Sequence, residues 1–128
     1  MKFLLQLSLI LLIISCSTSI TQNDAVIRFN KQDYDFGIIQ LKNEVEYSFE
    51  FSNPDKTPLV INNVKTSCGC TAVEWTRRPV KPGNHGTITV RYDAATPGIF
   101  HKEITVYYNG PGSPVMLKIN GKVEYPDL

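Results

Sequence analysis

Two of the three cysteines, Cys68 and Cys70, are separated only by Gly69. A disulfide between them closes a loop of about three residues, for which chain entropy predicts roughly 1.6 kcal/mol, so a structural staple is a poor explanation. Small strained disulfides are easily reduced, and Gly69 gives the backbone freedom to bring the two Cα atoms together. The spacing is therefore compatible with a labile redox pair, although no helix is predicted beside it to lower the thiol pKa.

The same pair has two other interpretations. In an extended strand both sulfurs would point to one face, where two soft thiolates suit a cuprous ion, Cu(I). A zinc site would also need His85 and His101, whose spacing matches no zinc pattern. Alternatively, Cys68 and Cys70 are small packing residues at a tight turn, which in an oxidising compartment requires buried or paired thiols. Redox chemistry, copper binding and a structural role all stay open at this point.

A second group of candidate residues is Trp75 with Arg77 and Arg78. An aromatic ring beside two cations is suited to partner binding, because it can stack on a partner or hold an anionic sugar or lipid headgroup. The alternative is a partly buried tryptophan next to a basic loop. The chain has no Gly-x-Ser-x-Gly elbow and no phosphate-binding glycine loop, so we expect no catalytic residues and no enzyme activity, thiol–disulfide exchange excepted.

The elements that position these residues are predicted from a period of two that begins at Ala25. Apolar and polar side chains alternate through residues 44–52, as expected for an antiparallel strand with one buried face. The same alternation recurs in 88–92, in 104–108 and in 115–125, where Gly121 interrupts it. Shorter candidate strands are 26–29, 36–41, 59–64 and 71–75.

Turn signals separate these strands, and no segment carries a helical stripe. The signals are Asn53-Pro54-Asp55, Lys81-Pro82-Gly83-Asn84, Thr96-Pro97-Gly98 and Asn109-Gly110-Pro111-Gly112. Seven or eight short strands with a turn about every ten residues predict an all-β fold, an immunoglobulin-like antiparallel β-sandwich, with a barrel as the less favoured alternative.

With 128 residues the chain has the length of one domain. A formal charge of +1 with interspersed signs argues against nucleic-acid binding.

The first fifteen residues have the features of a signal peptide. Lys2 is followed by an apolar stretch over 3–14, which is too short for a membrane-spanning helix. The segment Ile13-Ile14-Ser15-Cys16 resembles the bacterial lipoprotein lipobox, which implies cleavage before Cys16 and lipidation of its sulfur. Several acyl chains together anchor a protein stably to a membrane. We therefore expect a signal peptide over 1–15, a lipid-anchored flexible tether over 16–24 and the sandwich domain over 25–128.

Ser17 follows Cys16, and no cluster of acidic residues comes soon after it. By resemblance to lipoprotein sorting signals, this implies an outer-membrane lipoprotein of the bacterial cell envelope that faces the periplasm.

Motifs along almost the whole mature chain resemble the bacterial domain-of-unknown-function family DUF1573. They are Tyr34-Asp35-Phe36-Gly37, Ser67-Cys68-Gly69-Cys70-Thr71, Trp75 with Pro79, Lys81-Pro82-Gly83, Val90-Arg91-Tyr92-Asp93, Gly98 with Phe100, Ile104-Thr105-Val106 and Ile119-Asn120-Gly121-Lys122-Val123. The resemblance implies an immunoglobulin-like domain similar to the Hydin and major-sperm-protein types, and it implies no activity.

The function we expect is a lipid-anchored binding or assembly module with an envelope protein partner. The alternative is a thiol-based redox or copper-handling protein that uses Cys68 and Cys70.

Overall fold

The structure, a computed structural model, describes residues 24–127. The predicted signal peptide, the predicted lipidation site Cys16 and the predicted tether up to residue 23 lie outside this part of the chain. The described residues contain no helix, and hence none long and apolar enough to cross a bilayer. They form eight strands: β1 (Arg28–Phe29), β2 (Asp33–Gln40), β3 (Val45–Ser52), β4 (Ile61–Thr66), β5 (Thr71–Trp75), β6 (His85–Tyr92), β7 (Gly98–Tyr108) and β8 (Val115–Glu124).

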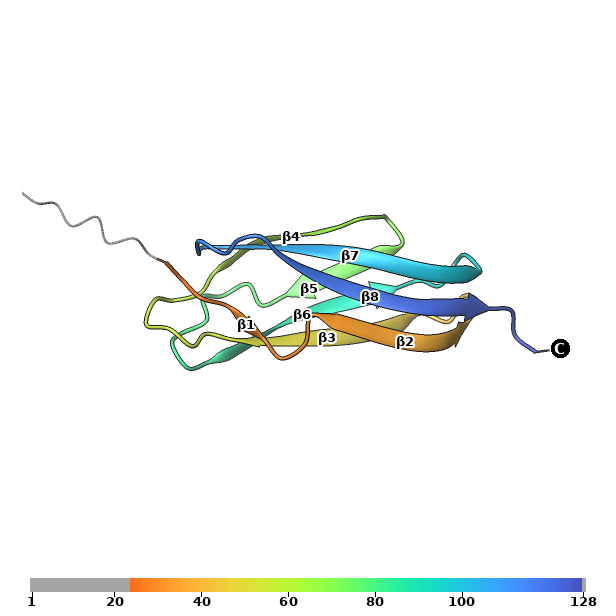
Figure 1. The fold of residues 1–128 in the computed structure, drawn as a ribbon, viewed down its shortest axis with the longest axis horizontal. Helices are drawn as coiled ribbons and strands as arrows, with labels where there is room; N and C mark the ends of the chain where they lie inside the picture. Colours follow the sequence, from red (N-terminus) through yellow and green to blue (C-terminus); the bar gives the residue numbers. More distant parts are fainter. Residues whose placement is uncertain (1–23, 128) are drawn as a thin grey trace, which may run out of the picture.

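The strands form two four-stranded sheets that lie face to face (Figure 1). One sheet has the order β1-β3-β6-β5 and the other β2-β8-β7-β4. All paired strands are antiparallel except β2 and β8, which run parallel. The chain changes sheet between β1 and β2, so its first two strands lie at the edges of different sheets. The predicted β-sandwich is confirmed, with one parallel pair added to the expected antiparallel arrangement.

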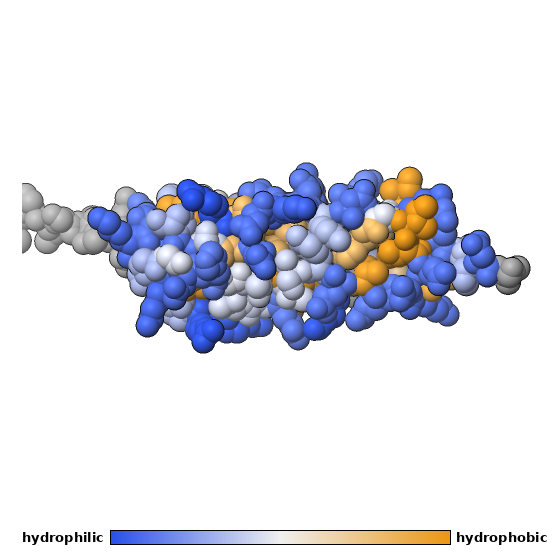
Figure 2. Space-filling view, turned by 90° about the horizontal axis from the view of Figure 1, so that it is seen from below, coloured by the Kyte–Doolittle hydropathy of each residue, from blue (hydrophilic) through white to orange (hydrophobic). Residues whose placement is uncertain are grey.

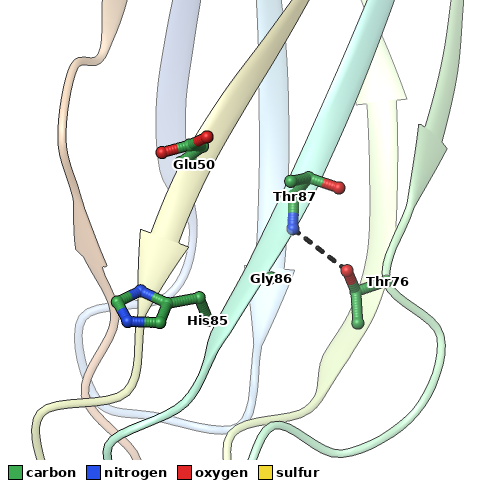
Figure 3. A pocket seen from close by; sticks show the side chains of 5 residues that line it. All are labelled: Glu50, Thr76, His85, Gly86 and Thr87. Carbon is green, nitrogen blue, oxygen red and sulfur yellow. Dashed lines mark hydrogen bonds between the residues drawn. The ribbon is translucent and has the colours of Figure 1, made fainter.

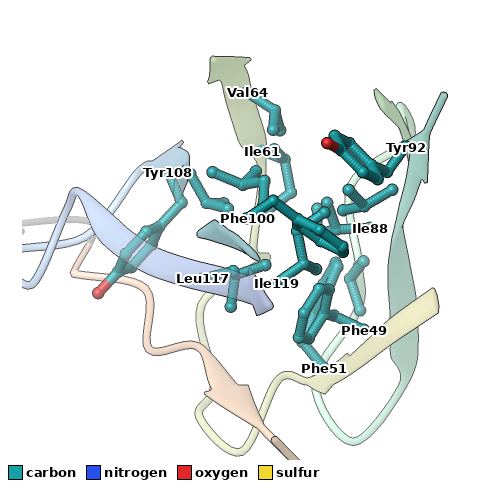
Figure 4. Packing of buried hydrophobic residues seen from close by; sticks show 14 of the residues in the cluster. Phe49, Phe51, Ile61, Val64, Ile88, Tyr92, Phe100, Tyr108, Leu117 and Ile119 are labelled. Atoms are coloured by element: carbon teal, nitrogen blue, oxygen red, sulfur yellow. The ribbon is translucent and has the colours of Figure 1, made fainter. Parts of the chain in front are cut away.

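The alternation of apolar and polar residues produces the core between the sheets. On β3, Phe49 and Phe51 are fully buried, and Ile88 of β6 is the cross-strand partner of Phe49. Leu117 and Ile119 of β8 enter the same cluster from the opposite sheet (Figure 4). Burying a large apolar side chain contributes about 1.5–3 kcal/mol, so this layer holds the two sheets together.

β8 agrees with the sequence-based expectation at Gly121 and differs from it at Tyr125. The strand continues through Gly121 to Glu124, and the glycine interrupts only the apolar alternation, as predicted. A Cβ atom at position 121 would lie 2.7 Å from the ring of Phe100, so the glycine makes room for that ring in the core. Tyr125, which we expected on the buried face, follows the end of the strand and is 71% exposed.

The two ends of the sandwich differ in which loops they carry (Figure 1). At one end, which we call the Ala25 end, the backbone N–H of Ala25 donates to the carbonyl of Asn109, and the loops 53–60, 76–84 and 109–114 gather there. At the opposite end, the Glu124 end, lie the loops 41–44 and 93–97 and the end of β8. Whatever precedes Asp24 therefore joins the domain at the end opposite Glu124.

Candidate functional site

The structure joins Cys68 and Cys70 in a disulfide, with their Cα atoms 5.4 Å apart. The pair lies in the turn through which the chain crosses from β4, an edge strand of one sheet, to β5, an edge strand of the other. Because this segment is a turn and not an extended strand, the same-face argument for a cuprous ion does not hold. The bond also occupies both sulfurs, so a metal could bind only after reduction.

The disulfide turn is held at both ends by backbone hydrogen bonds. The N–H of Ser67 donates to Glu103 O on β7 (3.1 Å), and the N–H of Asp93 donates to Cys70 O (3.1 Å). Both cysteines are half-buried. The hydroxyl oxygen of Thr71 lies 3.7 Å from Cys68 Sγ and 3.9 Å from Cys70 Sγ, close enough to donate to a thiolate on either. The backbone of the turn is therefore held in place, the disulfide is partly accessible to solvent, and the Thr71 hydroxyl lies next to both sulfurs.

The histidines do not join this pair. His85 begins β6 in one sheet, whereas His101 lies on β7 in the other. Within residues 24–127 there is no group of three or more His, Cys, Asp or Glu side chains arranged to hold a metal ion.

The three residues of the predicted partner-binding group separate into two places. The Arg77 guanidinium carbon lies 3.5 Å from the centroid of the Trp75 ring, which is half-buried at the end of β5. Arg78 instead lines a pocket with Lys81 and His85. Both groups lie in or beside the loop 76–84 at the Ala25 end.

A buried asparagine organises this end of the sandwich. Asn53 is fully buried, and its side-chain amide donates to Thr57 O (2.8 Å) and Val80 O (2.9 Å). Its backbone N–H donates to Asn84 O (3.0 Å), and its carbonyl accepts from Gly83 N–H (2.8 Å). From the sequence, Asn53 is predicted only as the start of a turn. Its hydrogen bonds to the loop 76–84 were not predicted.

An exposed apolar pair at the Glu124 end was also missed from sequence. Ile38 and Ile99 are 69% and 74% exposed, although both occur in strands. Lys122 is the cross-strand neighbour of both, so the three residues form one row across β2, β8 and β7, which we call the Ile38–Ile99 row. The space-filling view shows apolar side chains gathered at this end (Figure 2).

A bulge explains why Ile38 points outward. The register of β2 against β8 shifts between Asp35 and Ile38, where Gly37 adopts a positive φ of 69° and its N–H donates to Asp35 Oδ1 (2.8 Å). The extra residue places Ile39 in the core and moves Ile38 to the outer face. The only sequence signal of this change is the isolated glycine inside a predicted strand.

The sequence model of DUF1573, a family described as a protein of unknown function, matches residues 27–123. The chain belongs to this family. No curated protein matches the sequence.

Solved structures share the fold of this DUF1573 chain. A protein of unknown function from Porphyromonas gingivalis W83 has a TM-score of 0.71 at 18% identity, over 81% of this chain and 50% of that one. The PapD-like domain 7 of human CEP192 gives 0.69 at 6% identity, over 82% and 89% of the two chains. The VesB protease of Vibrio cholerae gives 0.60 at 20% identity, over 78% and 32%. At these identities the likeness establishes the β-sandwich fold alone, and this chain spans half of the Porphyromonas protein and about a third of the protease.

Proposed function

We propose that this DUF1573 protein is a lipid-anchored binding module of the bacterial cell envelope, without catalytic activity, that holds a protein partner against the Ile38–Ile99 row. The observation that carries the proposal is the exposure of two isoleucines on either side of Lys122 in one sheet. Large apolar side chains gathered on the surface mark interaction sites when polar residues surround them.

The energetics favour a protein surface as the occupant. Complete burial of an exposed isoleucine contributes about 1.5–3 kcal/mol, so the two side chains supply a central apolar anchor for an interface. Lys122 lies between them, and its Nζ is 2.7 Å from Glu124 Oε1. Both residues of this ion pair are about half exposed, so they form the polar part of the contact area. Because the row is built on hydrogen-bonded strands, binding requires little ordering of the backbone.

The position of the row fits an anchored protein. The row lies toward the Glu124 end, whereas Ala25 lies at the opposite end of the sandwich (Figure 1). A chain anchored through Cys16 would therefore attach to the membrane from the far end of the domain. In this arrangement the row points away from the lipid surface and toward periplasmic partners.

Affinity capture with matched variants tests the partner. The full chain is purified from detergent-solubilised envelopes beside the double variant Ile38→Asp/Ile99→Asp and the control Lys118→Asp, which changes an exposed residue on β8. We expect one stoichiometric envelope protein with the parent and the control and none with the double variant. Recovery of no partner in any growth condition, equal recovery with the double variant, or self-association through the row would each contradict the proposal.

The anchor has its own test. Metabolic labelling with palmitate should mark the parent chain and not the Cys16→Ser variant, and the mature protein should begin at residue 16. A mature protein that still begins at Met1, or labelling that Cys16→Ser leaves unchanged, would remove the anchor from the proposal.

The Cys68–Cys70 disulfide favours a second function, thiol–disulfide exchange. A partner dithiol would reduce the bond: two electrons and two protons pass to Cys68 and Cys70, and the partner becomes a disulfide. The observation in favour is the half-buried bond with the Thr71 hydroxyl beside both sulfurs. Copper handling would require the same reduced state, because Cu(I) binds thiolates.

Thiol trapping of the native protein tests this second function. Alkylation with and without reductant, followed by mass measurement, reports whether the pair is oxidised and exchanges in intact envelopes. A pair that stays oxidised throughout growth and exchanges with no thiol would exclude the redox function, and absence of micromolar Cu(I) binding by the reduced protein would exclude copper handling.

A further inference from the structure

We propose that the pocket formed by Arg78, Lys81 and His85 at the Ala25 end binds the phosphate of an anionic membrane lipid. This inference deepens the proposed function and rests on its lipid anchor, because the anchor brings this end of the domain to the headgroups. In this arrangement the basic loop 76–84 contacts the membrane, and the Glu124 end binds the protein partner.

The lining of the pocket suits a phosphate group. The pocket has a volume of about 370 Å³, and Thr76 and Asn84 add polar side chains to those of Arg78, Lys81 and His85. No carboxylate lines it. Arginine binds phosphate through a planar pair of N–H donors, and lysine adds a compact charge.

The neighbouring pocket is different. Figure 3 shows it on the outer face of the β3–β6–β5 region, where Thr87 N–H donates to Thr76 Oγ1 (3.0 Å). It shares Thr76 and His85 with the first pocket but includes Glu50. Glu50 Oε2 accepts a hydrogen bond from the Asn30 side chain (3.2 Å). The negative charge of Glu50 makes this second pocket unfavourable for an anion. We therefore assign the phosphate to the pocket that contains Arg78 and Lys81.

The backbone of the pocket is fixed before any ligand arrives. Val80 and Leu59 exchange two backbone hydrogen bonds of 2.8 and 2.9 Å. The buried side chain of Asn53 donates to Val80 O, and Asn53 N–H donates to Asn84 O. A phosphate would therefore meet a loop that is already ordered, which lowers the entropy lost on binding.

The pocket is connected to the point where the described chain begins. Ala25 N–H donates to Asn109 O, Asn109 N–H donates to Val60 O, and Leu59 pairs with Val80 of the pocket. Asp24 is eight positions after Cys16, which is a distance of at most about 29 Å for any chain conformation. An anchor on Cys16 would thus keep the pocket within reach of lipid headgroups.

The charges of the two ends are opposite. The loops 53–60 and 76–84, together with Asp24 and Ala25, carry four basic residues against two acids, which are Lys56, Arg77, Arg78 and Lys81 against Asp24 and Asp55. At the other end, segments 41–44, 93–97 and 125–127 carry one lysine against three acids, which are Lys42, Glu44, Asp93 and Asp127. An anionic surface therefore attracts the Ala25 end and repels the Glu124 end, so electrostatics would orient the domain on the membrane.

The chain contains its own reporter of this contact. Trp75 is the only tryptophan, and it lies at the end of β5 next to the loop that carries Arg78 and Lys81. Lipids brominated on their acyl chains quench a tryptophan that approaches them. Trp75 emission therefore reports how closely the Ala25 end approaches the acyl chains.

The experiment reconstitutes the full lipidated chain into vesicles of brominated phosphatidylcholine, with or without phosphatidylglycerol. We expect Trp75 quenching that appears with phosphatidylglycerol and is lost at high salt. The double variant Arg78→Ala/Lys81→Ala should require much more anionic lipid, with about a five-fold effect for each removed charge. The control double variant Lys65→Ala/Lys118→Ala removes two charges from β4 and β8 and should behave as the parent. Equal quenching in both kinds of vesicle, or none in either, would overturn the inference.

A second measurement separates this inference from the anchor. Flotation with vesicles of phosphatidylcholine alone shows whether the lipid anchor is present, because the headgroup site is not expected to bind this lipid. Short-chain phosphatidylglycerol is then titrated into the protein in neutral detergent, and the His85 ring signals are followed by NMR. We expect saturable shifts that short-chain phosphatidylcholine does not produce and that Arg78→Ala/Lys81→Ala abolishes. Flotation without these shifts would reject the headgroup site and leave the anchor in place, whereas shifts without flotation would reject the anchor alone.

Discussion

The guanidinium carbon of Arg77 lies 3.5 Å from the centroid of the Trp75 ring. Arg77→Ala should move the tryptophan emission to longer wavelength, because the ring loses a cover that excludes water. The free energy of unfolding should fall by less than about 1 kcal/mol, since exposed cation–π contacts are weak. Arg78→Ala is the matched control and should leave the emission unchanged. An unchanged spectrum for Arg77→Ala would show that the contact is absent in solution.

The buried Asn53 side chain predicts a large loss of stability on substitution. Asn53→Ala removes the donors to Thr57 O and Val80 O; Val80 O keeps the Leu59 N–H, whereas Thr57 O loses its donor, and a buried carbonyl left without a partner costs about 1–3 kcal/mol. Urea unfolding should show a loss of about 1–3 kcal/mol. The exposed Asn62 offers a control, because Asn62→Ala should change stability by less than about 0.5 kcal/mol. Equal stability of the two variants would contradict the role given to Asn53.

A methyl group at Gly121 should destabilise the core. The Cβ of Gly121→Ala would lie 2.7 Å from the Phe100 ring and 3.0 Å from Gly37 O, which predicts a loss of about 1–3 kcal/mol. Gly69→Ala is a suitable control, because nothing lies within 4 Å of its added Cβ. Adding Phe100→Leu to Gly121→Ala should restore part of the stability. If Gly121→Ala were as stable as Gly69→Ala in thermal unfolding, the close approach of Phe100 would be wrong.

Two buried tyrosines predict a loss of stability at alkaline pH. Burial raises the pKa of Tyr92, with a further contribution from the charge of Asp93, and burial also raises the pKa of Tyr108. Above the ordinary tyrosine pKa of about 10, the folded state therefore holds more protons than the unfolded state, so the free energy of unfolding falls as pH rises. Below that pH the two tyrosines add no pH dependence. In urea titrations, Tyr92→Phe/Tyr108→Phe should lose less stability above pH 10 than the parent; an identical decline would refute the assignment.

The sequence was sufficient to predict the sandwich because its strands obey local rules. Phe49 and Phe51 alternate with polar residues on β3, and Asn109-Gly110-Pro111-Gly112 ends β7 where a turn was expected. The boundaries of β5 were also predicted, at Thr71 and Trp75. The parallel pairing of β2 with β8 depends on a change of sheet, and such a contact between distant segments leaves no local pattern.

Much less of the candidate sites was predictable. The sequence predicts Trp75, Arg77 and Arg78 as one partner-binding group, but spacing could not show that Arg77 covers the ring whereas Arg78 joins Lys81. The exposed Ile38 depends on a one-residue bulge at Gly37. One of the two acceptors of the Asn53 amide, Val80 O, lies 27 positions away in sequence. In each case the decisive contact is set by tertiary structure and not by the neighbouring residues.

Photo-crosslinking in intact cells tests most directly the claim that the Ile38–Ile99 row holds a protein partner. A photoreactive amino acid replaces Ile99 in one strain and Ser48, on the outer face of the other sheet, in a second. Irradiation should give one discrete adduct from position 99, identifiable by mass spectrometry as an envelope protein and lost when Ile38→Asp is added. Position 48 should give none. No adduct from position 99, or the same adduct from both positions, would contradict the proposed binding function.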